Sequence, residues 1–252
     1  MIDPSSSDFW PGLFHVLMVG TGQTLYMVSV ALVITVLVGL PLGVVLVGTE
    51  PGGLFSAPFG SRRFGVVANR LLEFVVNLGR SVPFIILMVA LIPFTRLVVG
   101  TFIGTTASIV PLTVVAIPFF ARMVEIAIKE VDSGLVEAAE SLGATRWQIV
   151  SKVLVPEALS PMILGMSTTV TSIINFSAMV GVVAGGGLGD VAVRFGYQRY
   201  STIHMVAVII IIFLLVMALQ GFANWLARRF SHQGRVARSA RTAASMRVQP
   251  AL

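Results

Sequence analysis

The chain has 252 residues, of which 56% are hydrophobic and only 11% are charged, and its mean hydropathy is +0.94. A water-soluble domain averages about 25% charged residues, so this composition indicates that lipid rather than water surrounds most of the chain. The absence of cysteine excludes disulfides, thiolate metal sites and cysteine nucleophiles. The net charge of +6 is better explained by membrane orientation than by nucleic-acid binding.

The N-terminal part, residues 1–23, is predicted to be an extracytoplasmic segment. It contains no lysine or arginine, and Asp3, Pro4 and Asp8 precede the first apolar run, so it does not resemble a cleavable signal peptide. Because about 20 apolar residues are needed to cross the hydrocarbon core, the sequence predicts an all-α membrane domain over residues 24–227. Its five transmembrane helices are expected near residues 24–47, 81–99, 106–128, 162–184 and 203–226.

Residues 64–80, just before the second predicted span, have the pattern of an amphipathic helix that carries Arg70, Glu73 and Arg80. This helix is expected to continue into the span with a bend at Pro83, because proline disrupts the preceding helical turn. No charge is expected in the middle of the membrane. Ion-coupled transport needs ionisable residues at that depth, so the pattern disfavours a secondary transporter without removing it as an alternative.

Lysine and arginine are distributed unevenly along the chain. None occurs before Arg62, whereas six arginines follow residue 227. The positive-inside rule therefore puts the N-terminus outside and the C-terminus in the cytoplasm, which requires an odd number of spans. With five spans, only three of the 17 basic residues lie outside, and these are Arg96, Arg194 and Arg199.

Residues 129–157 form a polar loop between two apolar spans, and its local signals predict a helical hairpin. Asp132 and Ser133 are favoured N-cap residues for a first helix. Gly143 stands where the end of that helix requires a left-handed backbone conformation. The charge distribution places this loop in the cytoplasm. A compact charged hairpin on the cytoplasmic face is typical of a docking element.

A second helix of the hairpin is predicted after Gly143. Thr145 and Gln148 have the spacing of a capping box, which satisfies two free amide groups at a helix start. This helix is expected to end near Pro156, because the residue before proline avoids the α region.

The fourth span, near residues 162–184, is unusually polar. Thr168, Ser172 and Asn175 recur at helical spacing and Met179 continues the same face. Polar groups in a bilayer prefer a bundle interior or a water-filled path, so this face is a candidate translocation path. Hydrogen bonding between helices explains threonine and serine equally well, and both interpretations stay open.

The glycine-rich stretch 185–190 is not predicted to bind phosphate, since no strand precedes it and no Lys-Ser/Thr pair follows. Irregular backbone that lines a pore or packs closely is the preferred interpretation, and Gly181 and Gly185 favour close helix packing. We predict no catalytic residues and no metal site. The three histidines are far apart in the sequence, at His15, His204 and His232.

The basic tail, residues 228–252, is predicted to be cytoplasmic and largely disordered, because it is rich in Ser, Ala, Arg and Gln without apolar periodicity. Its arginines could contact anionic lipid, but a solvated tail that fixes the membrane orientation is the preferred interpretation.

The hairpin also resembles the "EAA" signature of ATP-binding-cassette (ABC) importer permeases. The matching positions are Glu137, Ala138, Ala139, Gly143 and Pro156, with Val153 and Val155 where the family has isoleucine and leucine. Other stretches resemble the permease of the methionine importer specifically, although the glycine stretch departs from that pattern. These stretches are residues 80–87, 92–96, 109–113, 118–125, 177–179, 185–189 and 195–198.

The resemblance implies a type I ABC importer permease with five spans, in a bacterial inner membrane. Such permeases act as homodimers with two copies of an ATPase subunit and an extracytoplasmic methionine-binding protein. ATP is bound by the ATPase subunit, so the resemblance implies neither an enzyme nor a cofactor in this chain. Ala138 and Ala139 would let helices approach closely and Glu137 would face a basic partner. L- or D-methionine is the implied substrate, and another amino acid or small solute is the alternative.

Overall fold

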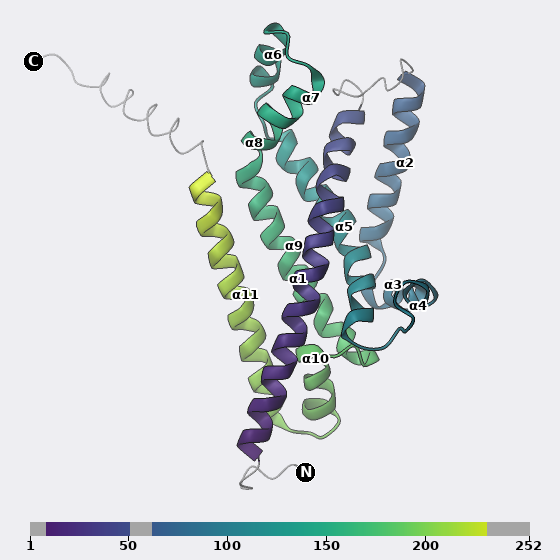
Figure 1. Cartoon of the computed structure of the whole chain (residues 1–252), viewed down its shortest axis with the longest axis vertical. Helices are drawn as coiled ribbons and strands as arrows, with labels where there is room; N and C mark the ends of the chain where they lie inside the picture. Colours follow the sequence, from purple (N-terminus) through teal and green to yellow (C-terminus); the bar gives the residue numbers. More distant parts are fainter. Residues whose placement is uncertain (1–8, 51–61, 231–252) are drawn as a thin grey trace, which may run out of the picture.

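The computed structural model describes residues 9–50 and 62–230, and its helices run side by side in an elongated bundle (Figure 1). Four helices in the described part of the chain are long and apolar enough to cross a membrane. A bent helix pair gives a fifth crossing if it counts as one span. The predicted all-helical membrane architecture is therefore confirmed.

Helix α1 (Phe9–Thr49) begins well before residue 24, where the first span was predicted to start. Its N-terminal part packs on the short helix α10 (Gly187–Val191). The side-chain oxygens of Gln23 and Thr24 accept hydrogen bonds of 2.8 and 2.9 Å from the backbone N–H groups of Gly187 and Leu188. These tertiary contacts stabilise a helix longer than the bilayer requires.

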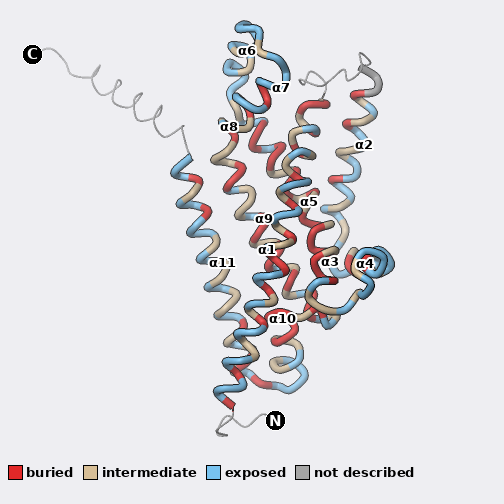
Figure 2. The backbone as a smooth tube through the Cα atoms, viewed as in Figure 1, coloured by how far each residue is buried: buried red, intermediate tan, exposed pale blue. Residues whose placement is uncertain are grey.

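Helix α5 (Thr105–Lys129) forms the centre of the bundle and contacts α1, α2 (Arg62–Ser81) and α9 (Leu159–Val180). Close approach of α1 depends on Gly43, where an added Cβ would lie 2.6 Å from the carbonyl oxygen of Ala121. Figure 2 shows buried residues concentrated along this centre. Helix α11 (Thr202–Phe230) packs mainly on α9 and buries few of its apolar side chains.

The predicted second span over residues 81–99 is wrong as a single helix. The chain instead forms α2, α3 (Phe84–Ala90) and α4 (Ile92–Val99), with an angle of 108° between α2 and α3. Pro83 lies at this break in an extended conformation, which confirms the predicted bend. A second break follows at Leu91, and α4 ends at Gly100 with a left-handed φ of 83°.

The glycine-rich stretch packs closely at the end of the bundle opposite the hairpin. It comprises the short turn η3 (Gly181–Val183), helix α10 and the π-helical η4 (Ala192–Tyr197). An added Cβ at Gly181 would lie 2.2 Å from the backbone nitrogen of Asp190, and one at Gly189 would lie 2.2 Å from the carbonyl oxygen of Ala178. Close packing, one of the two predicted uses of these glycines, is confirmed.

Candidate functional site

The predicted hairpin is present at one end of the bundle. Helix α6 (Ser133–Ser141) is N-capped by Asp132, whose Oδ1 accepts a 2.7 Å hydrogen bond from the N–H of Gly134. Gly143 adopts a left-handed φ of 77° in the turn. Helix α7 (Arg146–Ile149) begins with the predicted capping box of Thr145 and Gln148. These local predictions are confirmed.

The hairpin projects beyond the bundle and is largely uncovered (Figure 1). No residue of α6 is buried, and the apolar side chains of Leu142 and Trp147 are 88% and 71% exposed. Glu137 and Ala138 are exposed as well, whereas Ala139 packs partly against the core beneath. An exposed apolar tip on a well-capped hairpin is typical of a surface that binds a protein partner.

The helical run after α7 ends close to Pro156 as expected, at Glu157, but the predicted reason is wrong, because Val155 does not avoid the α region. A π-helical turn, η2 (Val150–Leu154), leads into α8 (Val155–Glu157), and Val155 keeps α-helical angles. The N–H of Val155 bonds to the carbonyl of Val150, five residues back. This wider turn places proline at the start of the next segment, where its missing N–H removes no helical bond. Helix α9 follows directly at Leu159.

A cavity of about 440 Å³ separates the hairpin from the nearby ends of α1 and α5. Its walls combine apolar side chains with the charged groups of Lys129, Glu137, Glu140 and Arg146. Glu137, predicted to take part in coupling, therefore faces a space between the hairpin and the bundle rather than a packed core.

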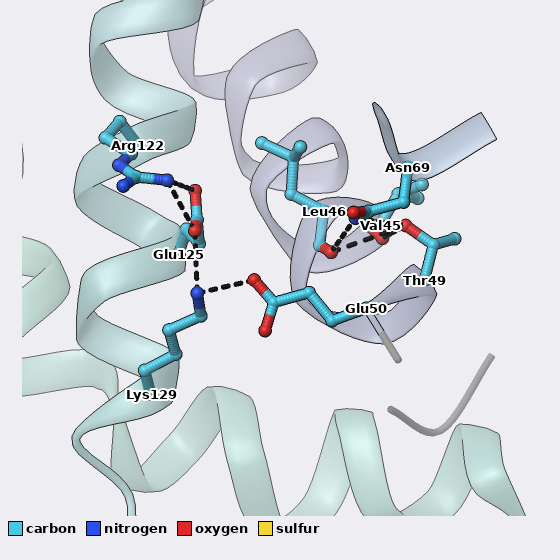
Figure 3. A network of polar contacts seen from close by, with 8 residues as sticks. All are labelled: Val45, Leu46, Thr49, Glu50, Asn69, Arg122, Glu125 and Lys129. Carbon is cyan, nitrogen blue, oxygen red and sulfur yellow. Dashed lines mark hydrogen bonds and ion pairs between the residues drawn. The ribbon is translucent and has the colours of Figure 1, made fainter. Parts of the chain in front are cut away.

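Beside this cavity, a network of ion pairs joins the ends of α1 and α5 (Figure 3). Glu125 is 1% exposed and accepts bonds of 2.6 and 2.7 Å from Nη1 of Arg122. Lys129 donates a 2.9 Å bond to Glu125 and pairs with Glu50 at the end of α1. Sequence reasoning missed that Lys129 links Arg122 and Glu125 to α1.

The four proposed path residues lie on one side of α9. Thr168, Asn175 and Met179 are exposed in the isolated chain and Ser172 is partly exposed. The hydroxyls of Thr168 and Ser172 donate to carbonyls of their own helix, at 3.2 and 3.0 Å. These two hydroxyls therefore need no neighbouring helix to satisfy them.

Sequence reasoning missed two polar residues of α11 that flank this face. Gln220 and Asn224 line a groove of about 310 Å³ together with Thr168, Thr171 and Ser172. Their spacing of four residues within an otherwise apolar span was the signal that could have found them.

One arginine, Arg80, lies beside the middle of a helix that is long enough to span a membrane. An added Cβ at Gly79 of α2 would lie 2.8 Å from the ring of Pro118, which stands midway along α5. The neighbouring guanidinium of Arg80 lies 5.7 Å from the centre of the Phe119 ring. Arg80 is therefore level with the middle of a spanning helix.

Comparison with known proteins places these features in a family context. Residues 51–232 match the family described as "Binding-protein-dependent transport system inner membrane component". The chain is 49% identical over 217 residues to the probable D-methionine transport system permease protein MetI of Vibrio cholerae, covering 86% of this chain and 93% of that protein. The corresponding protein of Pasteurella multocida is 46% identical, with 88% and 99% covered.

Among solved structures, the inward-facing MetNI methionine ABC transporter is similar throughout its fold. The match has a TM-score of 0.82 and 40% sequence identity, and it covers 88% of this chain and 99% of that one.

Proposed function

Because this chain belongs to the family of binding-protein-dependent transport system inner membrane components, we propose that it is the transmembrane subunit of an ATP-driven methionine importer. The observation that carries this proposal is the similarity over nearly the whole length of methionine permeases, at 49% identity. The capped hairpin with Glu137, Ala138, Ala139, Gly143 and Pro156 supports it independently, because it supplies the exposed coupling element that such a subunit needs.

The partners follow from this assignment. A separate ATPase subunit binds and hydrolyses ATP and receives the hairpin, whose exposed Leu142 and Trp147 offer it an apolar contact. Two copies of the chain form the pathway with two ATPase subunits, and an extracytoplasmic binding protein delivers the amino acid. The similar MetNI structure, which is titled a methionine ABC transporter, supports the association with an ATPase.

The mechanism requires the hairpin to move the bundle. Approach of the two ATPase subunits displaces the paired hairpins and favours the outward-facing state of a two-state equilibrium. Backbone hydrogen bonds run from α7 through η2 and α8 into α9, including Ala158 N–H to Leu154 and Met162 N–H to Ala158. We therefore expect movement of the hairpin to pass through these hydrogen-bonded segments to the polar face of α9.

The proposal is tested by transport in vesicles. The chain, its ATPase subunit and its binding protein are reconstituted, and uptake of radiolabelled L- and D-methionine is measured with ATP inside or outside. We expect ATP-dependent uptake of methionine that excess unlabelled histidine or alanine does not reduce. Equal competition by those amino acids would move the assignment to another amino-acid importer.

The membrane orientation is a further proposal, with the N-terminus outside and residues 129–157 in the cytoplasm. Figure 1 supports it, since the end of α11 lies on the hairpin's side and the start of α1 at the other end. In this cysteine-free chain, Ala144→Cys is expected to react with an impermeant thiol reagent only in inverted vesicles. Reaction in intact spheroplasts would instead place residue 144 outside the cytoplasm and would contradict the proposed orientation.

The path assignment of α9 predicts the effect of Asn175→Leu, which removes an amide at similar volume. We expect methionine-dependent ATPase activity to change while the melting temperature of the complex stays the same, because Asn175 is exposed on the proposed path. If Asn175 instead bonded a helix of the second copy, stability would fall by about 0.6–2 kcal/mol. A lowered melting temperature with normal transport would assign this face to packing.

A further inference from the structure

Helix α2 carries two distinct exposed faces. Arg70, Glu73, Asn77 and Arg80 follow one another at three- or four-residue spacing, so they share one face of the helix. A second exposed face carries large apolar side chains, namely Val67, Leu71, Phe74, Val75 and Leu78. In a bilayer the apolar face is suited to lipid, whereas the polar face requires water or a polar partner.

Contacts to α1 and α5 fix how deeply this polar face enters the membrane. The side-chain amide of Asn69 donates hydrogen bonds of 3.0 and 3.1 Å to the Leu46 carbonyl and the Thr49 hydroxyl, at the hairpin-side end of α1 (Figure 3). At about 1.5 Å per residue, α2 rises about 16 Å from Asn69 to Arg80. That is roughly half of a hydrocarbon core of about 30 Å, in agreement with the contact between Gly79 and Pro118.

Arg80 lies where α2 stops and the chain turns into α3. Its guanidinium is close to the Phe119 ring, and it makes no ion pair with any residue of the described ranges 9–50 and 62–230. A guanidinium near a ring still has N–H donors at its edge, and their planar arrangement matches a carboxylate. Arginine at this depth is costly in lipid and normally faces a water-filled cavity or an anion.

We propose that Arg80 binds the carboxylate of the transported amino acid at mid-membrane, and that the polar face of α2 below it lines the inner half of the pathway. The proposal rests on the proposed function, because import of an amino acid supplies the carboxylate. The break between α2 and α3 leaves the arginine at the end of a helix rather than between neighbouring turns. Asn77, one turn closer to the cytoplasm, is an exposed amide on the same face.

The test uses the absence of cysteine from this chain. Arg80→Cys is assembled with a cysteine-free ATPase subunit and the binding protein, and methionine uptake is measured before and after thiol modification. We expect uptake to fall about tenfold or more, as for loss of a charge-assisted hydrogen bond. Modification with 2-aminoethyl methanethiosulfonate restores a cation at position 80 and is expected to recover uptake. Modification with methyl methanethiosulfonate adds a neutral group and is not expected to recover uptake.

Accessibility provides a second readout with a matched control. Leu78→Cys lies at similar depth on the apolar face of the same helix, where the native side chain is 52% exposed. A permanently charged thiol reagent is expected to label the cysteine at 80 much faster than the one at 78. Equal labelling, or no recovery with the cationic reagent, would overturn the proposal.

Two further results distinguish failure of the Arg80 proposal from failure of the proposed function. Dissociation of the assembled complex by Arg80→Cys, seen in size-exclusion chromatography, would assign the arginine to a carboxylate of the second copy and overturn substrate binding. If the unsubstituted complex imports no methionine, the proposed function fails, while selective labelling at position 80 would still support a water-lined α2 face.

Discussion

Replacing Gly189 with alanine is expected to destabilise the bundle strongly. The added Cβ would lie 2.2 Å from the carbonyl oxygen of Ala178 and 2.6 Å from its Cα, which are backbone atoms of α9. A side chain could rotate away, but this backbone cannot, so α9 and α10 must separate. Overpacking of a well-packed site costs about 1–3 kcal/mol, and contact with rigid backbone puts this change at the upper end.

The measurement is the apparent melting temperature of the purified complex, which is expected to fall by about 5 °C or more. Gly22→Ala is the matched control, because an added Cβ there meets nothing within 4 Å and alanine favours the helix. We expect the control to melt at or above the temperature of the unsubstituted complex. Equal melting of the two variants would mean that the α9–α10 contact is looser than described.

Glu125→Gln is expected to give the second large effect, because it removes the buried carboxylate that holds Arg122 and Lys129 together. Without it, Arg122 loses its ion-pair partner and Lys129 keeps only Glu50. Hydrogen bonds to charged groups contribute about 1.5–3 kcal/mol, and we expect a loss of stability in that range. Transport is expected to fall as well, since Lys129 ends the helix that leads into the hairpin.

Glu130→Gln is the control for Glu125→Gln. It is the same chemical change on an exposed residue only five positions away that has no ion pair among the described side chains. Surface charges of this kind contribute little to stability, so stability and uptake should both be retained. Comparable losses in both variants would indicate that net charge, rather than the buried network, determines the effect.

The hairpin could be predicted from sequence because its determinants are local. Asp132, Gly143, Thr145 and Gln148 act on backbone groups within a few residues, and the structure contains each of their caps and turns. Four of the five predicted spans were predictable for a similar reason, since helix length and hydropathy suffice for them. The roles of Glu137, Ala138, Ala139 and Pro156 in coupling stay predictions, as does the path formed by Thr168, Ser172, Asn175 and Met179.

The features that sequence reasoning missed depend on contacts between distant segments. Helix α1 extends back to Phe9, and Val16 and Leu17 in this extension pack against Leu188, Val191 and Val208, which no local signal marks. The depth of Arg80 became visible only from the contacts of Asn69 with α1 and of Gly79 with α5. A hydropathy window placed the span over residues 81–99 because it averages over the breaks at Pro83 and Leu91.

The tail after residue 230 and the N-terminal residues 1–8 lie outside the described residues, so the predictions made for them stay open.

The π-helical turn at Val150–Leu154 fixes the direction in which the hairpin points. An α-helix advances about 100° for each residue, so the extra residue of a π turn rotates everything before it about the helix axis by roughly that angle. Deleting one residue within the turn would restore regular helix and leave both the hairpin and α9 intact. The exposed Leu142 and Trp147 would then face a different side of the membrane protein, and a partner positioned by the rest of the complex would no longer meet them.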